Sequence, residues 1–388
     1  MKRRTNHTYH ASMEDLCFSK EAKENMVHKL MQKQKEQNMY RNNRKKLTLI
    51  AVAATLILAT MTGAAVFTRW SKTAQIRYNP SEDIKEQAKD SGLSVLLEEN
   101  KGNENPEGIL SVTDQGITIT AVQTIVDNYQ AWITFRIEGF ELPEDEWPAV
   151  WPTVTIDGDQ FFGGLQSGDF YNGLTQNEKG ETVYAATGLP VKSDADGCLI
   201  MDPVAQDGSL EYTHFISFEQ TDGRYMGKEI VFTFDSIDFQ SHQKAGTPVP
   251  QVEGNWQLKW TLTGTDNSIQ VSPNAPIGDS GVILLDAEVG QISLRTRYQL
   301  KDYWEGWDEL AEFPQAVWGV RMKDGTEYRC YGGSSGFEDQ NNMIYYVESR
   351  MYDILDISQV ESLMFRTHYD TDEHGYPVNQ TFCYIPVS

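Results

Sequence analysis

The sequence predicts a mainly β protein: two tandem β-sandwich-like extracytoplasmic domains, preceded by a single transmembrane α-helix and a short cytoplasmic helix. Three observations lead to this fold class. An uncharged apolar run extends from Leu47 to Phe67. Apolar and polar residues alternate in many short stretches from Ile109 onward, which is typical of strands with one buried face. Nine Trp, 18 Tyr and 16 Phe are too many for a disordered chain and indicate packed cores.

The apolar run, residues 47–67, has the length of a membrane span. At about 1.5 Å per residue it forms a helix of roughly 31 Å, close to the hydrocarbon thickness of about 30 Å. A buried globular helix would be apolar along one stripe, whereas this run is apolar all round. A cleaved signal is the stronger rival because Thr62 to Ala65 are small, but the run is longer than a usual signal core. We therefore expect an uncleaved span.

The charge beside the span predicts its orientation. Residues 1–46 carry twelve Lys or Arg against five Asp or Glu, a balance of +7. Because the chain holds 33 basic and 56 acidic residues, the part from Arg69 onward holds 21 and 51, a balance of −30. The positive-inside rule then places the N-terminus in the cytoplasm and the acidic bulk outside the cell. That acidic bulk argues against nucleic acid as a partner and suits solubility or cationic ligands.

The cytoplasmic tail, residues 1–46, contains one helix candidate. Ser19 is a suitable N-cap, and apolar residues then recur with helical spacing among several lysines. The apolar stripe is formed by Ala22, Met26, Val27, Leu30 and Met31. A helix this short cannot bury its stripe within the tail, so it needs a second surface. Anionic lipid and a cytoplasmic protein both fit.

The residues after the span, 68–108, are polar and rich in Glu, Lys, Asn and Gly, so we expect a stalk that proteases can reach. Within it, Ser81 is expected to cap a short helix that runs through Ile84 and Ala88. The stalk ends in a helix-breaking stretch before Pro106.

The first outer domain is expected over residues 109–240. Apolar residues alternate strictly from Gly116 to Ala121, and again from Ala131 to Ile137 after the turn residues Asp127 and Asn128. This pattern predicts a hairpin with one buried face. Strand character returns from Ile230 to Phe239.

Residues 241–253 contain Pro248 and Pro250 and are expected to form a linker to a second domain, residues 254–388. Its first strand is predicted by the alternation of Trp256, Leu258, Trp260 and Leu262. The remaining features are predicted strands at 283–287 and 292–300, a hairpin at Lys323-Asp324-Gly325, a helical turn at 356–363 and a last strand from Thr381 to Val387.

Cysteine is sparse and no CxxC occurs. Cys17 lies inside, while Cys198, Cys330 and Cys383 lie outside and are odd in number. A disulfide between Cys330 and Cys383 and buried free thiols are both open. His7, His10 and Cys17 lack a regularly spaced fourth ligand, so no zinc site is expected.

The tests for catalytic chemistry fail. Gly332 to Gly336 spells the G-x-S-x-G of a hydrolase elbow around Ser334, but the polar residues that follow lack the stripe of the required helix. The loops at Asp194 and Asp370 resemble the start of a calcium loop, yet each lacks a glutamate at the twelfth position. We expect no enzyme, no cofactor and no metal.

Three stretches carry a resemblance to a known family. They are Leu16 to Lys23 with Met26 and Leu30, Gly116 to Thr120 with the strand through Phe135, and Asp356 to Phe365. The arrangement resembles single-pass membrane proteins of Gram-positive bacteria that have an outer domain of unknown function and are associated with extracytoplasmic-function sigma factors. The zinc-binding His-x-x-x-Cys-x-x-Cys of the best-known anti-sigma domain is absent.

The resemblance implies a transmembrane regulator of anti-sigma-factor type. Its inner helix would hold a cytoplasmic sigma factor, and its outer domains would receive a signal from an extracytoplasmic ligand or protein. The implied partner-binding residues are Phe18, Ala22, Met26, Val27, Leu30 and Met31. The alternative is a membrane-anchored surface binding or structural module whose tail only orients insertion.

Overall fold

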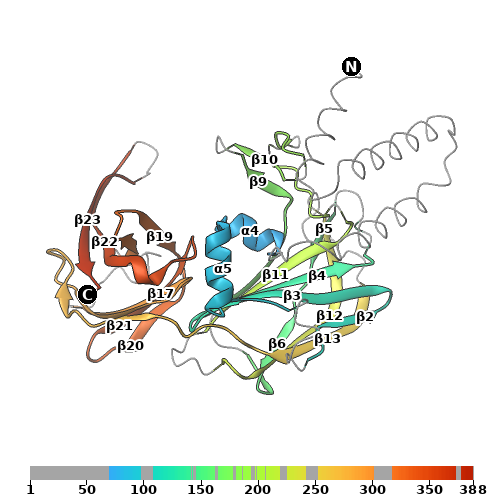
Figure 1. Ribbon diagram of the computed structural model, residues 1–388, viewed down its shortest axis with the longest axis horizontal. Helices are drawn as coiled ribbons and strands as arrows, with labels where there is room; N and C mark the ends of the chain where they lie inside the picture. Colours follow the sequence, from blue (N-terminus) through green and yellow to red (C-terminus); the bar gives the residue numbers. More distant parts are fainter. Residues whose placement is uncertain are drawn as a thin grey trace. The chain divides into compact units, whose positions relative to one another are not determined.

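We analysed a computed structural model of the chain, which divides into two units, residues 1–67 and residues 68–388 (Figure 1). The structure describes residues 70–97, 108–140, 142, 146–161, 165–177, 181–185, 187–193, 197, 199–205, 207–218, 225–241, 252–300, 317–372 and 377–387. The partner-binding residues predicted in the tail and the predicted span therefore lie outside the described residues. Of the helices within the described ranges, none combines the length and apolar character needed to cross a bilayer.

The fold is mainly β, as the sequence predicts. The helices and strands of the N-terminal half, residues 70–262, are α4 (Lys72–Tyr78), α5 (Glu82–Asp90), β1 (Ser94–Leu96), β2 (Ser111–Asp114), β3 (Ile117–Val126), β4 (Gln130–Glu138), β5 (Glu146–Ala149), β6 (Thr153–Ile156), β7 (Asp159–Gln160), β8 (Gln166–Phe170), β9 (Leu174–Gln176), β10 (Thr182–Tyr184), β11 (Leu210–Ser217), β12 (Glu229–Ser241) and β13 (Val252–Thr261). Those of the C-terminal half, residues 269–387, are β14 (Ile269–Val271), β15 (Ala275–Pro276), β16 (Ile283–Val289), β17 (Ser293–Gln299), β18 (Val317–Met322), β19 (Glu327–Tyr331), β20 (Ser335–Asp339), β21 (Ile344–Met351), the 3-10 helix η1 (Ile357–Gln359), β22 (Val360–Thr371) and β23 (Pro377–Pro386).

The segment from Trp70 to Leu97 is folded, where the sequence led us to expect a stalk. Ser71 caps α4 by accepting a hydrogen bond from the Ala74 amide at 3.2 Å, and Ser81 caps α5 as predicted. Strand β1 then pairs with β3. Five side chains of this segment are buried in a cluster: Trp70, Ala74, Tyr78, Ala88 and Leu93. Small helices rich in Lys and Glu have few apolar residues, and three of those in α4 and α5, Ala74, Tyr78 and Ala88, are buried here.

The N-terminal half contains two antiparallel sheets that share one core. The first has the order β1-β3-β4-β11-β8 with β2 beside β3, and the second has the order β13-β12-β6-β7 with β5 beside β12. The predicted hairpin from Gly116 to Ile137 is confirmed as β3 and β4. Aromatic rings fill the space between the sheets, and Phe135 contacts Phe232, Phe234 and Trp260. The separate pair β9 and β10 forms a small two-stranded sheet.

Strand β13 belongs to the N-terminal half, which differs from the expected division of the outer region at residues 241–253. It pairs with β12 from Glu229↔Thr261 to Ile237↔Val252. Its predicted apolar face is confirmed, but Trp256 and Trp260 are buried in the core of the N-terminal half. The strand that we expected to open the second domain therefore completes the first. The two prolines that suggested a linker lie in the connection between β12 and β13, of which residues 242–251 are outside the described ranges.

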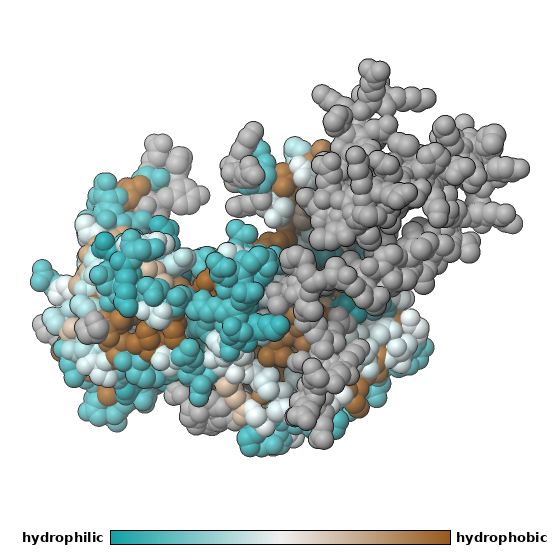
Figure 2. Space-filling view, in the orientation of Figure 1, coloured by the Kyte–Doolittle hydropathy of each residue, from teal (hydrophilic) through white to brown (hydrophobic). Residues whose placement is uncertain are grey.

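The C-terminal half is a ten-stranded antiparallel sheet with the order β14-β16-β17-β21-β19-β18-β22-β23, with β15 beside β16 and β20 beside β21. The Lys323-Asp324-Gly325 turn joins β18 to β19 as predicted, with Gly325 at φ 88°. The expected helical turn is the short η1, capped by Asp356. A separate core contains Tyr298, Leu363 and Phe365. Hydrophilic residues cover much of the described surface on the face shown in Figure 2.

Candidate functional site

The turn between β3 and β4 connects the two halves. Asp127 is buried and accepts a hydrogen bond from Ser293 of β17 at 2.6 Å. Its carboxylate also accepts from the amides of Tyr129 and Gln130 within the turn, at 3.0 and 3.1 Å. The Gln130 amide group donates to the Ser349 carbonyl oxygen of β21 at 3.1 Å. We call these contacts, together with those of Glu288 and Glu348 described next, the joint.

Glu288 of β16 accepts hydrogen bonds across the joint. The Tyr129 hydroxyl donates to Glu288 Oε2, and Asn128 donates to Oε1 at 2.9 Å. Ser268 also donates to Oε1, at 2.8 Å. Burial alone would raise the pKa of Glu288, but these hydrogen bonds outweigh burial and the pKa is lowered. Glu288 is therefore an ionised acceptor at neutral pH, and burial together with this anion raises the pKa of Tyr129.

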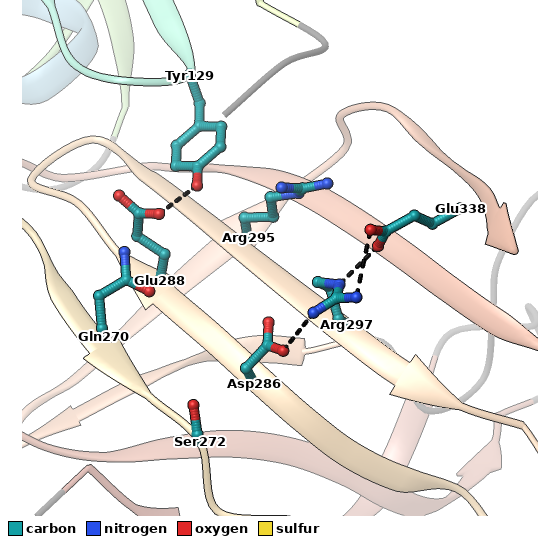
Figure 3. Close-up of a pocket in the computed structure, with 8 residues that line it drawn as sticks. All are labelled: Tyr129, Gln270, Ser272, Asp286, Glu288, Arg295, Arg297 and Glu338. Carbon is teal, nitrogen blue, oxygen red and sulfur yellow. Dashed lines mark hydrogen bonds and ion pairs between the residues drawn. The ribbon is translucent and has the colours of Figure 1, made fainter. Parts of the chain in front are cut away.

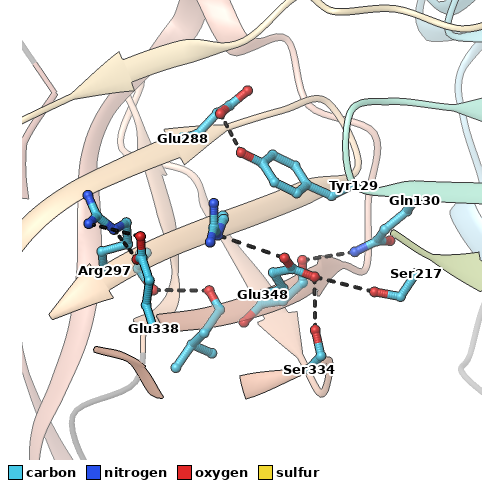
Figure 4. A network of polar contacts seen from close by, with 12 residues as sticks. Tyr129, Gln130, Ser217, Glu288, Arg297, Ser334, Glu338 and Glu348 are labelled. Atoms are coloured by element: carbon cyan, nitrogen blue, oxygen red, sulfur yellow. Dashed lines mark hydrogen bonds and ion pairs between the residues drawn. The ribbon is translucent and has the colours of Figure 1, made fainter. Parts of the chain in front are cut away.

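Glu348 of β21 is a second carboxylate at the joint, and its side chain is only 2% exposed. Ser334, from the loop between β19 and β20, donates to Oε2 at 2.8 Å, and Ser217 of β11 donates to the same atom at 3.4 Å (Figure 4). Arg295 Nε lies 3.8 Å from Oε1. Ser217 and Ser334 come from different halves, so Glu348 also joins the two halves.

A polar pocket of about 390 Å³ opens beside the joint (Figure 3). It is lined by Tyr129, Gln270, Ser272, Asp286, Glu288, Arg295, Arg297 and Glu338. Arg297 donates to Asp286 at 2.6 Å and to Glu338 at 2.6 and 3.2 Å. Three carboxylates and two guanidinium groups thus face a space large enough for a small polar molecule. The arrangement suits binding by hydrogen bonds and ion pairs.

Cross-strand pairing explains the charged wall of the pocket. Asp286 and Glu288 alternate on β16, while Arg295 and Arg297 alternate on β17. The register pairs Asp286 with Arg297 and Glu288 with Arg295, so opposite charges face each other. Reading the sequence did not identify these residues. The alternation of acids in one predicted strand and arginines in the next was the signal that could have found them.

The motifs that the sequence analysis tested have structural roles or lie outside the described residues. Ser334 lies in a loop between two strands, and β20 follows it where a hydrolase elbow would need a helix. Cys330 and Cys383 are free thiols, so the disulfide that the sequence left open is not formed. Cys330 donates to the Val317 carbonyl oxygen at 3.2 Å, and burial raises its pKa to about 12.

The acidic and histidine motifs form no metal site within the described ranges, where no group of three or more potential ligands gathers. His214 is buried between Tyr212 and Gln166, and burial lowers its pKa to about 4. His368 lies 3.5 Å from Asp370 on the surface. Residues 194–196 lie outside the described ranges.

Comparisons with known proteins add little to this description of the site. No family model matches the chain, and no curated protein matches it. A solved structure, the crystal structure of a conserved domain protein from Bacillus anthracis, is similar with a TM-score of 0.43 and 12% sequence identity. The similarity covers 76% of this chain and 93% of that chain.

Proposed function

We propose that the chain is a single-pass membrane regulator of anti-sigma-factor type. Its cytoplasmic helix would bind a sigma factor through the apolar stripe around Met26. Its acidic outer region, two tandem β-sandwich-like domains in this proposal, would receive a signal through an extracytoplasmic ligand or protein. The proposed role is binding, because the pocket carboxylates Asp286, Glu288 and Glu338 are each already paired with an arginine or a tyrosine.

One observation carries the proposal. Helix α4 begins five residues after the end of the apolar run, at Lys72. The cluster that buries this helix also contains Ile125 of the N-terminal half and Ile292 of the C-terminal half. A rearrangement of the joint would therefore alter the packing of the helix that is closest in sequence to the predicted span. The short stretch of backbone between α4 and the predicted span would then carry the change to the membrane.

The second candidate is a membrane-anchored surface binding or structural module. The dense hydrogen bonding of Glu288 and Glu348 favours it, because such a network holds the two halves in one arrangement. The two candidates differ in what the cytoplasmic tail does. A regulator loses its effect on transcription when residues 5–35 are deleted, whereas a module keeps its surface activity.

The experiment has two parts. Protease treatment of whole cells tests topology: the outer region should be digested while an epitope at the N-terminus stays protected. Capture with residues 1–46 as bait then tests the partner. We expect a sigma factor among the captured proteins, and we expect Met26→Asp to abolish its capture.

Gln32→Asp is the matched control for the capture experiment. It adds the same charge to the predicted helix, but on the side away from the apolar stripe, and should leave capture unchanged. If the bait captures no sigma factor, or if both substitutions reduce capture equally, the regulator proposal is wrong. Protection of the chain beyond Trp70 in whole cells would refute both candidates.

A further inference from the structure

A cluster of arginine and aromatic side chains lies apart from the pocket. It consists of Arg77 from α4, Trp132 from β4, Phe215 from β11, Tyr331 from β19 and Arg350 from β21; we call it the arginine cluster. The guanidinium carbon of Arg77 lies 3.6 Å from the centre of the Trp132 ring. That of Arg350 lies 3.9 Å from the Phe215 ring centre. The two rings beneath them are themselves 4.5 Å apart.

Tyr331 contacts both guanidinium groups. Its ring centre is 5.4 Å from the Arg77 guanidinium carbon and 5.8 Å from that of Arg350. Tyr331 is thus a ring that the two guanidinium groups share. Two like charges over rings whose centres are 4.5 Å apart repel each other, which is unfavourable unless an anion compensates them.

Neither cation has an acidic partner among the residues that the structure describes. Arg297 pairs with two carboxylates, but neither Arg77 nor Arg350 forms an ion pair within 4.0 Å. Burial, and then the charge of Arg77, lower the pKa of Arg350, in keeping with two uncompensated cations side by side.

The same cluster holds buried polar atoms that lack a hydrogen-bond partner within the described part of the chain. They are Arg77 Nε, Arg350 Nε, Trp132 Nε1 and the Tyr331 hydroxyl. All four can donate a hydrogen bond, and three of them can only donate. Buried donors without acceptors are costly, so the cluster lacks an acceptor-rich group.

Solvent reaches the edge of the cluster. The side chains of Arg77 and Arg350 are only partly buried. Tyr352, whose ring centre lies 4.2 Å from that of Tyr331, is 52% exposed. A small ion could therefore reach the guanidinium groups without unfolding either half.

We propose that the arginine cluster binds a small oxyanion, a carboxylate or a phosphate, which bridges Arg77 and Arg350. Arginine is the side chain best suited to both groups, because its planar fork donates two parallel hydrogen bonds. The bound anion would hold α4 against β11 and β21, and thus against both halves. The proposal rests on the outer region alone and does not depend on the regulator role.

Thermal unfolding of the full chain in detergent tests this proposal. Sodium phosphate and sodium acetate are titrated separately to about 10 mM, with chloride keeping the ionic strength constant. For the wild-type chain we expect at least one of the two anions to raise the melting temperature by about 2 °C or more, since a ligand that binds only the folded state stabilises it. A response to phosphate alone, or to both anions, identifies the group that the cluster recognises.

Arg350→Gln should abolish the rise in melting temperature, and Arg350→Lys should keep part of it. The matched control is Arg329→Gln, which removes an exposed arginine outside the cluster, whose guanidinium carbon lies 5.8 Å from the centre of the Trp318 ring. It should keep the full rise. If Arg350→Gln does not fold, Arg77→Gln takes its place. The proposal is overturned if neither anion shifts the wild-type chain, or if the rise survives in the glutamine variants of both cluster arginines.

Discussion

The side-chain carboxylate of Asp127 is buried at the joint, where it accepts hydrogen bonds from Ser293 and from the turn amides. Burial raises its pKa to about 6, against 3.8 for the ordinary group, although donors from Ser293, Tyr129, Gln130 and Ile292 partly oppose the rise. Because the pKa is higher in the folded state, the folded chain holds this proton more tightly than the unfolded chain. The stability that Asp127 contributes is therefore full below about pH 4 and is lost as the pH rises through 6.

Asp127→Asn should remove this dependence on pH. The asparagine oxygen can still accept from the turn amides, and its amide group can donate to Ser293, so we expect the fold to persist. Between pH 4 and pH 7 the free energy of unfolding of the wild-type chain should fall relative to that of the variant, by at most about 3 kcal/mol. Denaturant unfolding of both proteins at several pH values measures this. Parallel pH profiles would show that Asp127 does not titrate in this range.

The strands show which features of the fold are readable from the sequence. Local alternation correctly predicted the β3–β4 hairpin, the β18–β19 hairpin and the buried face of Trp256, Leu258 and Trp260. It did not predict which strands pair across a long connection, because the proline-rich stretch between β12 and β13 has the composition of a linker. The contacts of the joint could not be predicted either, because Asn128 and Glu288 are 160 positions apart and no local pattern marks them as partners.

The loop between β19 and β20 offers a prediction from two adjacent glycines. A Cβ at Gly333 would lie 1.7 Å from the Glu348 carbonyl oxygen, whereas one at Gly332 meets nothing within 4 Å. Gly333→Ala should therefore cost about 2 kcal/mol or more, because the loop cannot then approach β21. Gly332→Ala should be neutral or slightly stabilising, since it restricts only the unfolded chain. Chemical denaturation of the two variants measures the difference, and equal costs would contradict the close approach.

The glycines of this loop also explain why the motif around Ser334 resembles that of a hydrolase. Gly333 allows the loop to touch β21, and Ser334 then donates to Glu348. The motif therefore serves packing and the joint. The sequence alone indicated the lack of a following helix, but it could not show that the serine contacts a buried carboxylate 14 residues later.

At the scale of the whole described region, the segment from Trp70 to Leu97 packs against both halves. Within this segment, the side chain of Lys85 is only 8% exposed and pairs with Glu82 of the same helix at 2.7 Å. Trypsin should therefore not cleave after Lys85 in the native chain, although we expected a protease-accessible stalk from the sequence. Limited proteolysis with mass spectrometry of the fragments tests this. Rapid cleavage after Lys85 in the native chain would instead support the expectation of an exposed stalk.

Leu93→Ala is the companion variant for this measurement. Leu93 is fully buried beside Ala88, so its truncation should cost about 2 to 5 kcal/mol and loosen the segment. Cleavage after Lys85 should then appear under conditions that leave the wild-type segment intact. If the variant stays as resistant as the wild type, the cluster around Leu93 does not hold the segment in place.

The cluster that contains Trp70, Ala74 and Tyr78 also contains Ile125, Ile292 and Ile354, from both halves of the described region. Tension applied to the backbone just before Trp70 would therefore load two β structures at the same moment. A pulling force at this point would therefore be shared between the two halves through that cluster.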